Sequence, residues 1–114
     1  MKLDTYLTQL KKNPESISFE DTMSAIDSNY DFTPSAFTNG TTKNNANENN
    51  GSCKIFFFAR ENNLSEDLTL HCFGDYYRND VLKNPDAEDH QNIRNFMTNG
   101  WSGISFDTNA LKVK

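Results

Sequence analysis

Three observations predict an α+β fold for this chain, as a single small domain with about five helices, one small antiparallel β-hairpin and one further short strand. Apolar residues recur at helical spacing through most of the sequence. One Asn-Gly pair, Asn39-Gly40, is typical of a hairpin turn. Near the end, Gly103–Asp107 alternates apolar and polar side chains as a strand does. The 114 residues are enough for one core and are treated as one domain, 1–114.

The first two predicted helices have clear apolar faces and end signals. Pro14 stops the first helix. Ser18 begins the second, and Asp21 completes a capping box with it. The apolar face of the first helix consists of Leu3, Tyr6, Leu7 and Leu10, and that of the second of Phe19, Met23, Ile26 and Tyr30.

The hairpin is expected to turn at Asn39-Gly40 in the type I′ conformation, because both residue types tolerate positive φ. Its strands would be Ala36–Thr38 and Thr41–Lys43. Residues 44–51, which read NNANENNG, predict a flexible polar loop. We interpret this loop as a connector in preference to a ligand loop.

The third helix is predicted over Cys53–Asn62. Its interior, KIFFFA, is apolar nearly all round, which a buried strand would also show. Ser52 as a cap, together with Arg60 and Glu61 near the end, favours a helix that is central and buried.

The fourth helix is expected to begin after Ser65 and to continue through Leu82, ending before Pro85. Gly74 interrupts this pattern, and glycine costs a helix about 1 kcal/mol relative to alanine. A glycine there indicates that the backbone packs closely against a neighbour.

Asp89 is the predicted N-cap of the fifth helix, whose apolar face consists of Ile93, Phe96 and Met97. Gly100 occupies the position of a left-handed C-cap, and Trp101 is expected to fold back onto the helix. The strand in Gly103–Asp107 is expected to pair with the hairpin. Residues 108–114 are expected to be a frayed tail.

Composition excludes several classes of function. The net charge is −5 and no run of Lys or Arg occurs, so we expect no nucleic-acid partner. No stretch of about 18 apolar residues is present, so we expect no membrane partner, and the N-terminus is too polar for a secretory signal. Cys53 and Cys72 do not make a disulfide framework. We therefore expect reduced cysteines in a cytoplasmic, acidic, monomeric protein.

Four blocks of the sequence resemble the HopJ type III effector family. They are YDFTPSAFTNG (Tyr30–Gly40), GSCKIFFFA (Gly51–Ala59), CFGDYYRNDVL (Cys72–Leu82) and DHQNIRNFMTNGWSGISF (Asp89–Phe106). The resemblance runs over about residues 18–106, and the blocks occur in the family's order. The loop NNANENNG departs most from the pattern.

The resemblance implies an effector-like protein of the kind that plant-associated bacteria deliver by type III secretion. The family carries no established activity or catalytic residues, so the resemblance transfers no site. A true effector would be exported by type III secretion. Export signals of that kind are unstructured, however, and a helix is predicted here from Lys2 or Leu3 onward. We therefore expect a resident cytoplasmic protein.

We predict no catalytic residue in the cluster His71, Cys72 and Asp75. Neighbouring helical residues project about 100° apart, so the imidazole of His71 and the thiol of Cys72 do not face each other. A buried structural cysteine is the simpler interpretation.

We likewise predict no metal site and no cofactor. One conceivable zinc set, Cys53, His71, Cys72 and His90, lacks the paired spacings that make zinc sites recognisable. A second acidic set does not match the spacing of a calcium loop; it consists of Asp80, Asp86, Glu88, Asp89 and His90.

A polar stripe of asparagines lies on the fifth helix, at Asn92, Asn95 and Asn99. Asparagine is a poor helix former, so these residues are not there for helix propensity. Their amides either recognise a ligand or join this helix to the hairpin, and the second interpretation is favoured. The candidate binding residues are Tyr77, Arg78, His90, Asn92, Arg94, Asn95 and Trp101.

Two functions of different classes remain. The first is a non-enzymatic interaction or binding module with an unknown protein or small-molecule partner. The second is a small-ligand-binding protein or small enzyme with a polar pocket where the last two helices meet, lined by Tyr76 together with the candidate binding residues. A concave pocket that buries His90 or Arg94 would favour the second function, and a flat surface the first.

Overall fold

The computed structural model describes residues 2–114 and confirms the α+β class. Its helices are α1 (Leu3–Lys12), η1 (Pro14–Ser16), α2 (Phe19–Asn29), α3 (Asn50–Glu61), α4 (Glu66–His71), η2 (Tyr76–Val81, a π-helix), α5 (Gln91–Asn99) and η3 (Gly100–Gly103). Its strands are β1 (Tyr30–Phe32), β2 (Phe37–Asn39), β3 (Thr42–Asn44), β4 (Ile104–Phe106) and β5 (Leu111–Val113).

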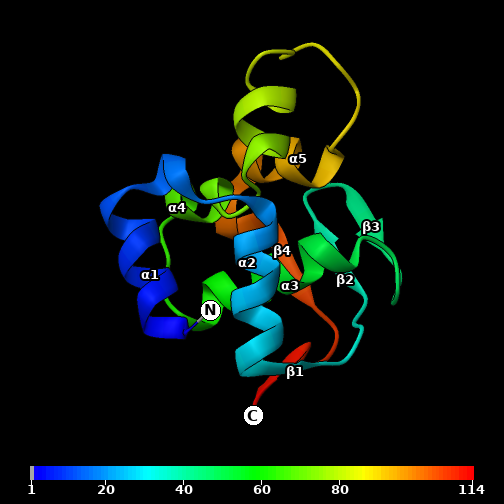
Figure 1. Ribbon diagram of the computed structural model, residues 1–114. Coiled ribbons are helices and arrows are strands. Elements are labelled where there is room, and N and C mark those ends of the chain that lie inside the picture. Colours follow the sequence, from blue (N-terminus) through cyan, green and yellow to red (C-terminus); the bar gives the residue numbers. More distant parts are fainter. Residues whose placement is uncertain (1) are drawn as a thin grey trace.

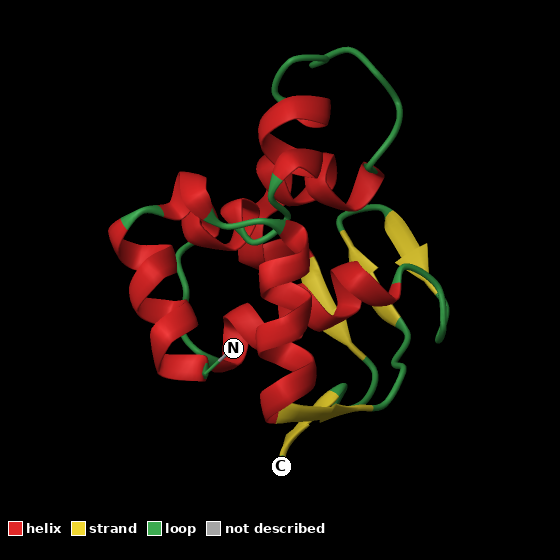
Figure 2. Ribbon diagram, in the orientation of Figure 1, coloured by secondary structure: helices red, strands yellow, loops and turns green. Residues whose placement is uncertain are grey.

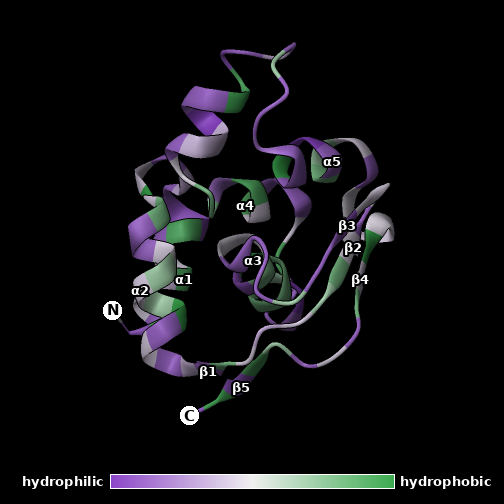
Figure 3. Ribbon diagram, turned by 90° about the vertical axis from the view of Figure 1, so that its right-hand side faces the viewer, coloured by the Kyte–Doolittle hydropathy of each residue, from purple (hydrophilic) through white to green (hydrophobic). Residues whose placement is uncertain are grey.

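Helix α3 is the centre of the fold. In Figure 3 it is seen nearly end-on, between the α1–α2 pair on one side and the strands β2, β3 and β4 on the other. Cys53 and the run Ile55–Ala59 are all buried. A helix enclosed on every side needs apolar residues all round, which explains the pattern KIFFFA and confirms a helix over a buried strand.

Phe56 shows how α3 joins the other elements. This side chain is fully buried, and its ring centroid lies 4.9 Å from that of Phe96 on α5 and 6.3 Å from that of Phe37 on β2. It also lies 5.4 Å from the ring of Phe73, just beyond α4. One aromatic residue of α3 therefore contacts the sheet, α5 and the segment between α4 and η2.

Two small antiparallel sheets complete the fold (Figure 2). The larger has the strand order β3-β2-β4, with Phe37 opposite Phe106 and Asn39 opposite Ile104. The predicted pairing of the last alternating segment with the hairpin is thus confirmed.

The end of the chain corrects the expectation of a frayed tail over residues 108–114. It contains β5, which pairs with β1 so that Tyr30 lies opposite Val113. Ala110 and Leu111 are buried. The pairing supplies backbone partners to β1, and it covers the apolar side chain of Leu111, which a frayed tail would leave in water.

The hairpin turn is shifted by one residue from its predicted position. Asn39 pairs with Thr42, so the two-residue turn is Gly40-Thr41. Gly40 has φ 62° and Thr41 has no positive φ, as in a type II′ turn with glycine first. The type I′ prediction was therefore wrong, because the fully buried side chain of Asn39 is held against α5 and cannot lie in the turn.

The polar stretch 44–51 is shorter as a loop than its composition indicates. Asn44 is the last residue of β3 and is buried, whereas Asn50 and Gly51 already belong to α3. Only residues 45–49 connect the strand to the helix. Ser52 therefore lies inside the first turn of α3. The prediction that Ser52 caps this helix was wrong.

The helix starts at Ser18 and Ser65 are confirmed. Ser18 forms the predicted capping box with Asp21, and the Ser65 hydroxyl accepts from the Leu68 backbone N–H at 3.1 Å. The prediction of Asp89 as a cap was wrong, since α5 begins after His90. The Asp89 carboxylate accepts from Arg94 instead, at 2.7 Å.

The predicted fourth helix is broken at Gly74. Helix α4 ends at His71, and a π-helix follows the break. Gly74 has φ 61°, and a Cβ there would lie 2.5 Å from the backbone nitrogen of Phe19. The close approach predicted at this glycine is confirmed, and it is the reason that one continuous helix does not form.

The C-terminal end of α5 follows the prediction in part. Gly100 ends the helix with φ 59°, but its ψ of −152° lies outside the left-handed helical region that was predicted. The Trp101 ring packs edge-on against Phe96, as expected, with 5.0 Å between centroids.

A buried polar contact joins α1 and α2 to the segment after α4. The Tyr6 hydroxyl lies 2.7 Å from the Thr22 Oγ1 and donates to the Cys72 Sγ at 3.3 Å. The Thr22 hydroxyl lies 2.8 Å from the Cys72 carbonyl oxygen, to which it donates. Burial raises the pKa of the Tyr6 phenol, and it raises that of the Cys72 thiol to about 12.

We expect the free energy of unfolding to fall as pH rises above about 9. In the unfolded chain Cys72 and Tyr6 ionise near their ordinary pKa values of 9.0 and 10.0, whereas the folded chain keeps both protons. In this pH range the unfolded state binds fewer protons than the folded state. Each group therefore lowers the free energy of unfolding by at most about 1.4 kcal/mol per pH unit, until the pH reaches its pKa in the folded chain. Urea denaturation across this range measures the loss. Tyr6→Phe should make the decline above about pH 10 shallower, and an identical decline in both proteins would contradict the assignment.

Candidate functional site

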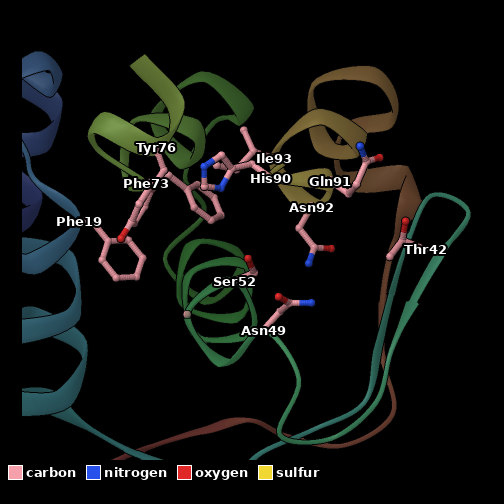
Figure 4. A pocket seen from close by; sticks show the side chains of 11 residues that line it. Phe19, Thr42, Asn49, Ser52, Phe73, Tyr76, His90, Gln91, Asn92 and Ile93 are labelled. Atoms are coloured by element: carbon pink, nitrogen blue, oxygen red, sulfur yellow. The ribbon is translucent and has the colours of Figure 1, made fainter. Parts of the chain in front are cut away.

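A pocket of about 350 Å³ opens among α2, η2 and the first turns of α3 and α5 (Figure 4). Its volume falls at the lower end of the range for small-molecule sites, roughly 300–1,000 Å³. The lining residues are Phe19, Thr42, Asn49, Gly51, Ser52, Phe73, Tyr76, His90, Gln91, Asn92 and Ile93.

One side of the pocket is aromatic. The Phe19 and Tyr76 rings meet edge to face, with 5.1 Å between centroids and 73° between planes. The Tyr76 ring also lies 5.2 Å from the His90 ring. Tyr76 is 41% exposed and is one of the four exposed large hydrophobic side chains of the described chain, with Leu82, Met97 and Val113. Its ring therefore offers apolar surface at the pocket that no part of the described chain covers.

The other side is built on a network of asparagine amides. Asn92 is only 6% exposed, and its Oδ1 accepts from Asn39 Nδ2 at 3.0 Å and from Asn44 Nδ2 at 3.2 Å. Its own Nδ2 donates to Asn44 Oδ1 at 3.0 Å. Asn49 Nδ2 donates to the same oxygen at 2.7 Å. These bonds fix the start of α5 to the hairpin and to the residue before α3.

His90 lies between the two sides, as Figure 4 shows. Its Nε2 is 3.0 Å from Asp80 Oδ2 and 3.8 Å from Asp89 Oδ2, and its side chain is 27% exposed. The hydrogen bond from Arg94 lowers the pKa of Asp89, so that carboxylate is held as an anion. The imidazole is thus oriented by Asp80 behind it, with its ring beside Tyr76.

Comparison with known proteins gives this chain a family. The sequence model described as HopJ type III effector protein matches residues 3–111. The chain belongs to the HopJ family. A crystal structure of the unknown-function protein VPA0580 is similar to this HopJ chain, with 60% sequence identity and a TM-score of 0.99. The likeness covers 100% of this chain and 95% of that one. Among curated proteins, none matches.

The HopJ pocket contains two of the seven binding residues proposed from sequence, His90 and Asn92, together with Tyr76 from the alternative proposal. Asn95 lies next to it on α5 but faces the hairpin, where its Nδ2 donates to Thr42 Oγ1 at 2.6 Å. The intramolecular role favoured for the asparagine stripe is therefore present in Asn92 and Asn95.

Both arginines of the proposed set bond to backbone carbonyls outside the pocket. Arg78 donates to the carbonyl oxygens of Ile17 and, at 3.3 Å, of Pro14, which ties η2 to the start of α2. Arg94 donates to the carbonyl oxygens of Asn84 at 3.0 Å and of Asp89 at 2.6 Å. It thereby closes the loop between η2 and α5, which stands out at the top of Figure 1.

The two remaining candidates lie elsewhere in the HopJ fold. Tyr77 is buried and meets the His71 ring edge-on, with 5.5 Å between centroids. Trp101 lines a separate shallow pocket with Arg60 and Leu64. The pocket thus brings together His90, Asn92 and Tyr76, and leaves Tyr77 and Trp101 apart.

Sequence reasoning did not place Phe19, Asn49, Gly51 or Ser52 at a site. Ser52 was assigned only as a cap, and the polar stretch before it only as a connector. A partial signal existed in Gly51, since a Cβ there would lie 2.9 Å from Cζ of Phe19, a close approach that a glycine permits. The approach joins α2 to α3 across the pocket and depends on long-range packing.

The chemistry of the cysteines agrees with the structural interpretation of Cys72. Both thiols are free and buried, and burial raises the pKa of each. They stay protonated at neutral pH and are poor nucleophiles in that state. Within residues 2–114, no group of three or more His, Cys, Asp or Glu side chains is arranged to hold a metal ion. No helix in that part of the chain is long and apolar enough to cross a membrane.

Proposed function

We propose that this HopJ chain is a non-enzymatic binding module, and that its recognition site is the pocket bordered by Tyr76, His90 and Asn92. One observation carries the proposal. A preformed concave surface joins an exposed aromatic ring to a rigid set of amides. Aromatic side chains such as Tyr at the centre of a well-packed surface are typical of recognition sites.

The state of the nucleophiles supports binding over catalysis. The thiol of Cys72 is held protonated by burial, and it bonds to Tyr6 within the core, away from the pocket.

The family description supports a partner protein in a recipient cell for an exported HopJ chain. The alternative that we propose is a resident cytoplasmic role, with a protein or small-molecule partner. In either place we propose that the chain acts as a monomer through the same pocket.

The proposal is tested by affinity capture from a cell extract with three immobilised proteins. We expect wild type and the exposed control Met97→Ala, which lies outside the pocket, to capture the same partner. Tyr76→Ala should weaken capture by about tenfold or more, as loss of a central aromatic residue does. Capture that is equal for all three would place recognition elsewhere and would contradict the pocket as its site.

A small enzyme remains the second candidate, because the pocket is concave and partly buries His90. Incubation of the protein with a metabolite extract, followed by mass spectrometry, separates the two functions. A binding module leaves the composition of the extract unchanged. Consumption of a compound that disappears with His90→Ala but persists with Met97→Ala would contradict the non-enzymatic proposal.

A further inference from the structure

We propose that the pocket takes an aromatic ring joined by a short link to a carboxylate. This chemistry is found in a free arylacetic acid and in the C-terminal aromatic residue of a peptide. The inference rests on the proposed function, because it names the ligand class of the same pocket. Its two parts follow from the two sides of the pocket (Figure 4).

The aromatic side fits a flat apolar group. Phe19, Tyr76 and the buried ring of Phe73 provide it, and Ile93 extends it. Tyr76 packs edge-on against Phe19 and leaves 41% of its own surface exposed beside His90. Aromatic pairs favour edge-to-face or offset arrangements, so a ligand ring would continue the existing series of rings. An aliphatic chain in the same place would bury a similar apolar area, but it would not make edge-to-face contacts with the aromatic rings.

On the opposite side, several hydrogen-bond donors meet no acceptor in the described part of the chain. Asn92, which is 6% exposed, uses one side-chain N–H on Asn44 Oδ1, and nothing in the described chain accepts its second. The Ser52 hydroxyl lines the same side and has no partner within residues 2–114. The backbone N–H groups of Gly51 and Gln91, in the first turns of α3 and α5, likewise meet no acceptor in the described part of the chain. These donors fit a group with several acceptor oxygens.

Charge selects a carboxylate over an amine. None of the residues that line the pocket is acidic. The two carboxylates beside the start of α5 are already paired, Asp80 with His90 at 3.0 Å and Asp89 with Arg94 at 2.7 Å. The starts of two helices add a partial positive charge of about +0.5 each, which attracts an anion and repels a cation. Because no Lys or Arg lines the pocket, we expect the affinity for a small anion to be modest.

Phenylacetate is the first probe, and two-dimensional NMR of the backbone amides is the readout. We expect phenylacetate to shift the amide signals of Gly51, Ser52, Gln91 and Asn92 with a dissociation constant on the order of 1 mM. Phenethylamine, which carries a cation on a similar ring, and propionate, which lacks the ring, should each bind at least about tenfold more weakly.

A short peptide ending in phenylalanine, with a free or an amidated C-terminus, distinguishes the two sources of the ligand. Tighter binding of the free-acid peptide than of phenylacetate indicates a chain terminus, and the reverse order indicates a small molecule.

Two variants assign the effect to the pocket. Tyr76→Ala should weaken phenylacetate binding by about tenfold, and Met97→Ala should leave it unchanged. Equal or tighter binding of phenethylamine, equal binding of propionate, or no shift of the pocket amides with any probe would each overturn the inference. The proposed function fails separately, when capture of a macromolecular partner is insensitive to Tyr76→Ala. Capture that depends on Tyr76 while phenylacetate does not bind would overturn only the ligand class.

Discussion

Gly74→Ala is expected to lower the free energy of unfolding by about 3 kcal/mol or more. Two costs combine at this position. Gly74 has φ 61°, where a side chain is strained by roughly 1–2 kcal/mol. The new Cβ would also lie 2.5 Å from the Phe19 backbone nitrogen and 3.0 Å from the Ser18 carbonyl carbon, which are backbone atoms that cannot rotate away. Overpacking of that kind costs roughly 1–3 kcal/mol more.

Gly51→Ala is the matched control for Gly74→Ala. Its Cβ would meet only the far end of the Phe19 ring, at 2.9 Å, and Gly51 has no positive φ. Alanine is favoured over glycine in a helix by about 1 kcal/mol, which offsets part of the contact. Urea denaturation of both variants measures the difference. Equal destabilisation by the two substitutions would show that backbone contact at Gly74 is not the cause.

Asn92→Ala is expected to lower the free energy of unfolding by about 3 kcal/mol. It removes the amide that bonds to Asn39 and Asn44 in a buried environment, and it leaves the Asn44 side chain with unpaired groups. A buried polar group without a partner costs about 1–3 kcal/mol. The midpoint of thermal unfolding should fall by roughly 12 °C, at about 4 °C per kcal/mol for a chain of this size.

Asn95→Ala serves as the comparison, because Asn95 is partly exposed and water can replace its bond to Thr42. We expect about 1 kcal/mol for this substitution. A loss at Asn92 no larger than that at Asn95 would mean that the buried amide network contributes little to stability.

The elements that the sequence predicts well are those whose signals are local. Ser18 and Ser65 cap helices because a hydroxyl bonds to a backbone N–H only a few residues ahead. Gly100 and Trp101 likewise end α5 through contacts within one turn. Such interactions depend on neighbouring residues, so spacing alone indicates them.

The predictions failed where a distant segment decides the local conformation. The turn moved to Gly40-Thr41 because α5 holds Asn39 in the core. The predicted fourth helix broke at Gly74 because α2 lies against it. Residues 111–113 form a strand because β1 lies within reach. None of these partners is close in sequence, and single-sequence periodicity does not report them.

Only part of the candidate site was predicted from the sequence, again because segments distant in sequence bring some of its residues together. His90 and Asn92 were named because polar and aromatic residues concentrate around them, and Tyr76 was named with them in the pocket alternative. Phe19 was not, since only the packing of α2 against η2 brings its ring to Tyr76. The two arginines, Arg78 and Arg94, had the composition of a recognition surface, yet backbone carbonyls of the domain accept their hydrogen bonds.

The strand pairings also set the order in which this fold can be completed. The middle strand of the larger sheet, β2, pairs with β4, and β1 pairs with β5 (red in Figure 1). Neither sheet can therefore be completed before the last part of the chain has been synthesised. Contacts between residues so far apart in sequence slow folding. During synthesis, helices can form while β1 remains unpaired, together with the edge of β2 that faces β4 in the complete sheet. Until β4 and β5 have left the ribosome, these edges are open to other chains, and this is the period of greatest exposure to aggregation.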